Sequence, residues 1–138
     1  MQILLIIVAV FVAAFGMVFF LNFRRMKMLA DVPESEKIVT LTGKNFKQVT
    51  SKGIALVDFW ASWCMPCKMM MPVLNEVAES VNGEAVIAKL NVEEYQDLAG
   101  EFAVRSIPTI IMFKNGKEID RMVGVKNKDY LLKKIRNA

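Results

Sequence analysis

The 138-residue sequence predicts an α/β protein with a central mixed β-sheet flanked by helices, preceded by one N-terminal transmembrane helix. Three observations support this prediction. Residues 3–21 form an uninterrupted apolar run, strand-like and helix-like segments alternate over residues 38–136, and Asn115–Gly116 lies between two strand-like segments. An Asn-Gly pair in that setting is a strong hairpin signal. Alternating elements that end in a hairpin are typical of a mixed sheet with helices packed on it.

The apolar run comes first in the chain. All 18 basic and 14 acidic residues lie from Arg24 onward, and a helix over residues 3–21 rises about 28 Å, close to the hydrocarbon thickness of a bilayer. A cleavable secretory signal fits less well, because no basic side chain precedes the run and Asn22–Arg25 is a poor cleavage site. A buried core helix would be unusual without a polar face. We therefore expect a transmembrane anchor over residues 1–23 that contacts the membrane through residues 3–21.

The charges that follow the run predict its orientation. Arg24, Arg25 and Lys27 flank its C-terminal end, and the positive-inside rule then places the rest of the chain on the cytoplasmic face. A long folded domain can override this rule, so the extracytoplasmic (periplasmic) face is the alternative. Without these three cations, 15 of the 18 basic residues remain against 14 acidic ones. The chain has no basic stripe with interleaved aromatic residues, so no nucleic-acid partner is expected.

The remaining elements follow in order. Residues 24–37 are polar and include Pro33, which predicts a juxtamembrane linker before a domain over residues 38–138. A helix from Cys64 onward carries apolar residues at helical spacing and ends at Asn82–Gly83. Periodicity and turn residues predict the other elements, namely strands over residues 38–41, 54–60, 85–92, 110–114 and 117–123 and helices over residues 43–52, 95–102 and 127–136.

The two cysteines of the chain, Cys64 and Cys67, stand where the strand over residues 54–60 gives way to a helix. Two thiols three positions apart can close into a disulfide or open into a dithiol, which is a two-electron switch. A helix N-terminus lowers the pKa of a thiol, and Pro66 is compatible with a first helical turn.

Other uses of a cysteine pair fit this sequence less well. A closed zinc site needs four ligands, and the chain has no histidine and no third cysteine. Covalent haem attachment needs a histidine where Lys68 stands. A purely structural disulfide would restrain little of the unfolded chain, and two thiols that merely pack are the remaining alternative. We expect redox activity without a metal or organic cofactor.

Several separately placed motifs closely resemble those of the thioredoxin family, and together they cover residues 38–138. They are Val57–Ala61, Trp60–Lys68 with its Cys-x-Pro-Cys pair, Lys89–Val92, Ile107–Thr109, Phe113–Gly116 and Gly124. The resemblance implies a thioredoxin fold and a protein disulfide reductase. Its partners would be disulfide-containing proteins as substrates and an upstream redox protein as electron donor.

The resemblance also implies roles for four residues. Cys64 would be the exposed nucleophile and Cys67 the resolving thiol, which lies deeper. Asp58 matches the family's buried acid, which takes the proton of Cys67, and Lys89 matches the lysine beside that acid. The apolar flanks of Asp58 favour its burial, and burial raises the pKa of a carboxyl toward neutrality, where it serves as a general base.

The substrate-binding residues implied by the resemblance surround the cysteine pair. Pro108 matches the family's cis-proline beside the disulfide, and the Ile107 backbone would pair with a substrate strand. Trp63 would cover the thiol pair. Met65 and Pro66 replace the family's commonest central pair, Gly-Pro, which leaves the redox potential open. The alternatives are an extracytoplasmic reductant or isomerase for a specific partner, and a non-catalytic thioredoxin-fold binding module.

Overall fold

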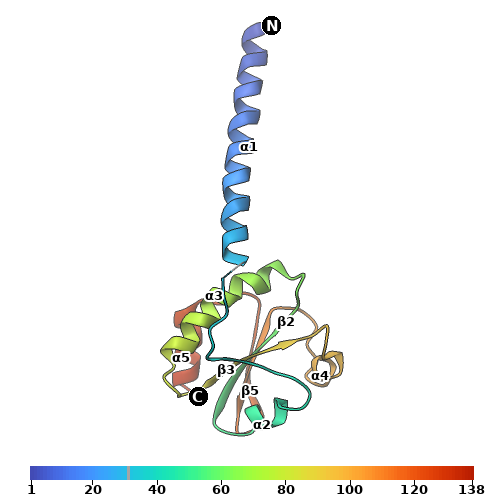
Figure 1. Ribbon diagram of the computed structural model, residues 1–138, viewed down its shortest axis with the longest axis vertical. Helices are drawn as coiled ribbons and strands as arrows, with labels where there is room; N and C mark the ends of the chain where they lie inside the picture. The colour runs from blue at the N-terminus through green and yellow to red at the C-terminus, as the bar shows by residue number, and fades with distance from the viewer. Residues whose placement is uncertain (31) are drawn as a thin grey trace. The chain divides into compact units, whose positions relative to one another are not determined.

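The computed structural model describes residues 1–30 and 32–138, with the backbone alone for residues 26–30. The chain forms two compact units, Met1–Val32 and Pro33–Ala138. Figure 1 shows the first as a single helix and the second as an α/β domain.

Helix α1 spans Gln2–Ala30 and makes up almost all of the first unit. The most apolar 18 residues within its Gln2–Arg25 part have a mean hydropathy of 3.1, so α1 is long and apolar enough to cross a membrane, features that a signal sequence shares. The helix continues beyond residue 23, so the segment expected as a linker begins as helix. Residues 24–30 contain neither glycine nor proline, and Pro33 is the first residue unable to continue a helix. Asp31, within that expected linker, lies outside the described residues.

The second unit contains the mixed sheet that the sequence predicts. Strands β1, β3 and β2 run parallel, while β4 is antiparallel to β2 and to β5, in the order β1-β3-β2-β4-β5. The strands are β1 Ile38–Thr40, β2 Ile54–Trp60, β3 Val86–Asn91, β4 Thr109–Lys114 and β5 Lys117–Val123. The helices of this unit are α2 Phe46–Thr50, α3 Met65–Ser80, α4 Gln96–Glu101 and α5 Lys128–Arg136. The element order and the thioredoxin fold are confirmed.

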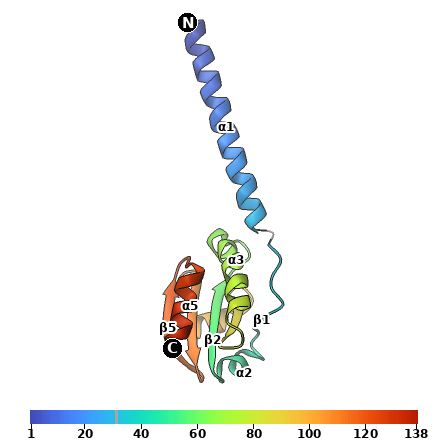
Figure 2. The ribbon, with the colours of Figure 1, turned by 90° about the vertical axis from the view of Figure 1, so that its left-hand side faces the viewer.

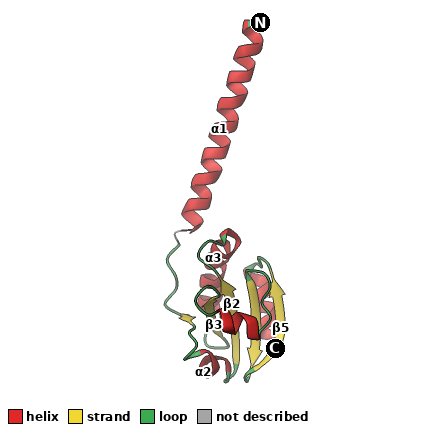
Figure 3. Ribbon diagram, turned by 90° about the vertical axis from the view of Figure 1, so that its right-hand side faces the viewer, coloured by secondary structure: helices red, strands yellow, loops and turns green. Residues whose placement is uncertain are grey.

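Side-chain alternation along β2 builds a core on both faces of the sheet. Val57 and Phe59 pack in the cluster that also contains Phe46 of α2, while Leu56 packs in the cluster formed with α3 and α5. Figure 2 shows the side covered by α3 and α5, and Figure 3 shows the opposite side, with α2. Because side chains alternate in a strand, Asp58 shares the face of Leu56, toward α3. The central position of β2 thus buries an acid beneath the helix that carries the cysteines.

The β4–β5 hairpin confirms the Asn-Gly prediction. Asn115 and Gly116 have positive φ of 50° and 81°, the backbone combination of the turn that matches the twist of paired strands. The Asn115 side chain also accepts a hydrogen bond from the Gly53 amide at 3.0 Å, which ties the turn to the start of β2. The hairpin therefore places β5 at one edge of the sheet, next to β4.

Residues 33–37, which we call the strap, belong to the folded domain although the sequence predicts them as linker. The Asn75 side chain of α3 accepts a hydrogen bond from the Ser35 amide at 2.9 Å and donates one to the Pro33 carbonyl at 2.8 Å. Glu79, one helical turn later, accepts hydrogen bonds from the Ser35 hydroxyl at 2.7 Å and from Lys37. Two polar side chains of α3 thus hold the strap against the domain.

Candidate active site

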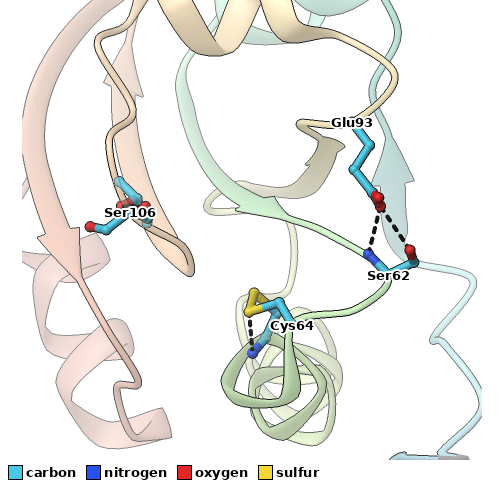
Figure 4. The surroundings of a disulfide bond; sticks show 6 residues. Ser62, Cys64, Glu93 and Ser106 are labelled. Atoms are coloured by element: carbon cyan, nitrogen blue, oxygen red, sulfur yellow. Dashed lines mark hydrogen bonds between the residues drawn. A yellow bond between two sulfur atoms is a disulfide. The ribbon is translucent and has the colours of Figure 1, made fainter.

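The cysteine pair forms a disulfide at the N-terminus of α3. The Cα atoms of Cys64 and Cys67 are 5.3 Å apart, and Cys64 is the N-cap residue, with an extended backbone. Its Sγ atom accepts a hydrogen bond from the Cys67 amide at 3.2 Å, as Figure 4 shows. Pro66 lies in the first turn. Once the disulfide opens, this amide and the positive end of the helix dipole favour the negative charge of a thiolate at Cys64.

The burial of the two cysteines differs from the sequence expectation. Cys64 and Cys67 are each 3% exposed, so Cys64 is not the more exposed residue of the pair in this disulfide form. The reason is local packing, because both cysteines lie in one cluster with Ala61, Trp60 and Ile107. The exposed surface of the site is made by the neighbouring side chains.

Those neighbours present an apolar rim around the disulfide. Trp63 is 68% exposed and Met65 44%, and Pro66 is also exposed. The Ile107–Pro108 peptide bond is cis, as the resemblance implies, with Pro108 buried and Ile107 half-buried. One groove brings together Trp63 and Ile107, and it is lined by Trp63, Val92, Val104, Arg105, Ser106 and Ile107. The loop that carries Ser106 is labelled in Figure 4.

Glu93 fixes the loop that precedes the disulfide. Its carboxylate accepts hydrogen bonds from the Ser62 amide at 2.9 Å and the Ser62 hydroxyl at 2.8 Å (Figure 4). These two hydrogen bonds lower the pKa of Glu93, and the bond from the Ser62 amide has the larger effect. Sequence reasoning missed this residue. The signal was available, since Glu93 follows β3 and Ser62 follows β2, and the carboxyl ends of adjacent parallel strands meet at one edge of the sheet.

Asp58 is a buried acid without a hydrogen-bond partner. It is 1% exposed, and no described residue hydrogen-bonds either of its carboxyl oxygens. Burial raises the pKa of Asp58 from 3.8 to about 7, against the smaller opposing effect of the Lys89 ammonium. Lys89 of β3 is the register partner of Asp58 on one side, and uncharged Ile110 of β4 is its partner on the other. The structure therefore brings the expected acid and lysine together.

Lys89 is held by a residue that the sequence analysis missed. Its side chain is buried, and its ammonium forms an ion pair and hydrogen bond with the Glu34 carboxylate of the strap. The same ammonium lies 5.2 Å from the centre of the Trp60 ring, close enough for a cation–π interaction. No local sequence pattern links Glu34 to Lys89, because the contact joins residues 55 positions apart.

Comparison with known proteins agrees with this geometry. The sequence model of the family described as thioredoxin matches residues 37–137. This chain belongs to the thioredoxin family. A thioredoxin of Chlorobaculum thiosulfatiphilum is 48% identical over 101 residues, which cover 72% of this chain and 94% of the relative. A thioredoxin of Staphylococcus haemolyticus is 49% identical over 94 residues, covering 68% of this chain and 90% of the relative.

Solved structures show the same likeness. A mutant thioredoxin from Halobacterium salinarum superposes with a TM-score of 0.69 at 33% identity, covering 77% of this chain and 94% of that one. A thioredoxin of Malassezia sympodialis gives a TM-score of 0.67 at 32% identity, covering 76% of this chain and 96% of that one. With its Cys-x-x-Cys disulfide, this thioredoxin is a thiol–disulfide oxidoreductase of the disulfide reductase type.

Proposed function

We propose that this thioredoxin is a membrane-anchored protein disulfide reductase in which Cys64 is the nucleophile and Cys67 the resolving thiol. The observation that carries the proposal is the disulfide at the N-terminus of α3 together with the buried carboxyl of Asp58, which has no hydrogen-bond partner among the described residues. A helix N-terminus activates the first thiol, and a carboxyl with a pKa near 7 can deprotonate the second.

The first step forms a mixed disulfide. The Cys64 thiolate attacks one sulfur of a substrate disulfide, the substrate S–S bond breaks, and one substrate sulfur leaves as thiolate and takes up a proton. The Cys67 amide that now donates to the Cys64 Sγ favours its charged form before the attack. In this step the Cys64 thiolate forms the new S–S bond, and the leaving substrate sulfur keeps the electron pair of the broken one.

The second step closes the disulfide seen in the structure. Asp58, as carboxylate, accepts the proton of the Cys67 thiol, and the resulting thiolate attacks the Cys64 Sγ. The bond between Cys64 and the substrate breaks, and the second substrate sulfur leaves as thiolate. Two electrons have then passed from the cysteine pair to the substrate. Lys89 acts beside Asp58 by favouring the carboxylate form.

Substrate recognition is assigned to the apolar rim. Trp63, Met65 and Pro66 would contact an extended segment next to the substrate disulfide, and the Ile107 backbone, before Pro108, would pair with that segment. Exposed apolar side chains and backbone hydrogen bonds give affinity with little sequence preference. This arrangement suits a reductase that acts on many oxidised proteins.

We assign residues 1–23 to a membrane anchor, residues 24–37 to a connecting segment whose last part, the strap, docks on the folded domain, and residues 38–138 to the thioredoxin domain. The length and hydropathy of α1 support an anchor. Arg24, Arg25 and Lys27 favour the cytoplasmic face for the domain, with the extracytoplasmic face as the alternative. The electron donor would be an upstream redox protein that reduces the Cys64–Cys67 disulfide and so completes the cycle.

The proposal is tested by trapping the mixed disulfide. In the full-length chain in detergent micelles, reduced Cys67→Ser should form a stable covalent adduct with a fluorescent disulfide-bonded peptide, because no resolving thiol releases Cys64. Cys64→Ser should form far less adduct, and both variants should lose turnover of the peptide to the background level. Electrophoresis without reductant detects the adduct.

A non-catalytic binding module gives the opposite result. In that case the wild-type chain does not turn over the peptide, and the two serine variants bind it as tightly as the wild type does. Equal adduct yields from both single variants would overturn the assignment of Cys64 as the nucleophile.

A further inference from the structure

The Lys89 ammonium has two acidic neighbours but hydrogen-bonds only one of them. In the parallel register of β2 and β3, Lys89 lies beside Asp58, and both side chains lie on the α3 side of the sheet. The ammonium nevertheless hydrogen-bonds Glu34 of the strap, and the Asp58 oxygens have no partner among the described residues. A buried carboxyl next to a buried ammonium would ordinarily pair with it, because both groups lose water on burial.

Contacts away from the site hold Glu34 in place. Asn75 and Glu79 of α3 bind the backbone and side chain of Ser35, the residue after Glu34. The Glu34 side chain is 30% exposed and that of Lys89 11%, so the pair lies between the buried site and the surface. The strap therefore presents a partly exposed carboxylate to the largely buried Lys89 ammonium.

We propose that Glu34 is a positioning residue that competes with Asp58 for the Lys89 ammonium and so keeps the Asp58 carboxyl unpaired. Two effects act in the same direction. Glu34 holds the ammonium away from a direct bond with Asp58, and its negative charge offsets part of the positive charge that Asp58 senses. Without Glu34, the Asp58 carboxylate would be stabilised and would become a weaker base toward Cys67.

The charged groups around Asp58 that matter for this equilibrium are few. Lys89 of β3 is the charged group that lowers the pKa of Asp58. Glu34 from the strap contacts that ammonium, Ile110 of β4 is uncharged, and Cys67 of α3 does not titrate while it is in the disulfide. In the oxidised protein, the titration of Asp58 therefore reports on the Lys89–Glu34 pair without interference from the thiols.

The test is a carbon-13 NMR titration of the Asp58 carboxyl in the oxidised, full-length chain in detergent micelles, with the signal assigned by Asp58→Asn. We expect Glu34→Gln to move the titration midpoint lower by about half a pH unit or more. Glu36→Gln removes the same charge at an exposed position of the strap and serves as the matched control, with no shift expected beyond about a tenth of a unit.

A double-mutant cycle shows whether the effect of Glu34 on Asp58 depends on Lys89. In the Lys89→Met background, Glu34→Gln should shift the midpoint much less, because the ammonium for which Glu34 competes is gone and only the direct effect of the Glu34 charge remains. The proposal is overturned if Glu34→Gln causes no shift, if Glu36→Gln shifts the midpoint equally, or if the shift caused by Glu34→Gln is equally large without Lys89.

A kinetic measurement links the titration to the chemistry and rests on the proposed function. The release of substrate from the Cys64 mixed disulfide should slow by up to about three-fold at pH 8 in Glu34→Gln, because Asp58 is a carboxylate in both proteins at that pH and is the weaker base in the variant. If the NMR midpoint moves while this rate is unchanged, Glu34 still positions Lys89, and it is the assignment of Asp58 as the base that fails. The two ideas are therefore distinguishable.

Discussion

Asp58 carries a cost in stability that follows from its burial. Its pKa rises from 3.8 to about 7 in the folded protein, so the folded state keeps a proton over a range in which the unfolded chain has already lost it. Between about pH 4 and pH 7 the folded state binds more protons, and the free energy of unfolding therefore falls as pH rises. Below this window the cost is absent, and above it the cost is fully present.

Asp58→Asn should remove this pH dependence, because an amide does not ionise. The oxidised wild-type protein should lose on the order of 3 kcal/mol of stability between pH 4 and pH 7, while the variant should lose much less. Guanidinium unfolding of the full-length chain in detergent, followed by tryptophan fluorescence, measures both profiles. Trp60 and Trp63 are the two tryptophans of the chain, and both lie next to the disulfide.

Asp97→Asn is the matched control for this experiment. Asp97 is exposed in the first turn of α4, so its substitution should leave the profile parallel to that of the wild type. If Asp58→Asn also gives a parallel profile, the Asp58 carboxyl is not protonated in the folded state near neutrality. Its role as a proton acceptor with a pKa near 7 would then fail as well.

Local sequence patterns predict the reactive residues of the site. They do not predict the residues that hold the reactive ones in place. The spacing of Cys64 and Cys67 and the apolar flanks of Asp58 are local patterns with a direct chemical meaning. Glu34 and Glu93 act through contacts 55 and 31 positions away in the chain. Such contacts depend on which strands become neighbours. The place of Glu93 directly after a strand gives a sign of its contact, whereas the polar segment around Glu34 gives none.

At the level of elements, the sequence predicts the interior of a helix or strand better than the residues at which it begins and ends. The bounds of β2 and β5 agree with the expected ranges. A continuous apolar run marks β2, and the Asn-Gly turn marks the start of β5. Helix α2 is shorter than expected, beginning at Phe46, because the Asn45 side chain accepts a hydrogen bond from the Thr42 amide in the preceding turn and makes no cap hydrogen bond to the helix. Local polar contacts of this kind set where a helix begins, and hydrophobic periodicity is insensitive to them.

The strap shows how a polar segment without regular structure can still be ordered. Asn75→Ala removes the side chain that bonds the Ser35 amide and the Pro33 carbonyl, so we expect the strap to open more often. Losing these two bonds should cost about 1–2 kcal/mol locally and should speed hydrogen exchange of the Ser35 amide roughly ten-fold. Exchange measured by NMR on the full-length chain in detergent reports this directly.

Gln48→Ala, at an exposed position of α2, is the control and should leave the Ser35 amide unchanged. Unchanged exchange in Asn75→Ala would show that Glu79 and Lys37 alone hold the strap. Docking of the strap would then rest on the Lys37–Glu79 ion pair, and not on the amide side chain.

On the scale of the whole molecule, apolar and charged residues are segregated between the two units. The first unit provides the apolar helix α1, and the second is a thioredoxin domain whose acidic and basic residues nearly balance. Relatives such as the thioredoxin of Chlorobaculum thiosulfatiphilum match 72% of this chain, over nearly their whole length. The N-terminal helix is thus an addition to a domain of ordinary thioredoxin size, and its effect would be to confine the reductase to a surface.

This addition leads to a prediction about location and orientation. Expressed in bacteria, the full-length chain should sediment with membranes, resist alkaline extraction and keep its N-terminal sequence, because Asn22–Arg25 is a poor cleavage site. A membrane-impermeant maleimide should label the reduced Cys64–Cys67 pair only after the cells are lysed, since Arg24, Arg25 and Lys27 favour the cytoplasmic face. The chain has no other cysteine, so the label reports on the domain alone.

The variant Gln2→Lys, Arg24→Gln, Arg25→Gln reverses the balance of cations across the helix, and labelling of intact cells should rise several-fold. Each result has a distinct meaning. Labelling of the wild-type protein in intact cells would place the domain on the extracytoplasmic face, where it would act on oxidised envelope proteins. Loss of the first residues would instead identify α1 as a signal sequence. Retention of the helix together with protection of the cysteines would confine the reductase to substrates at the cytoplasmic surface of the membrane.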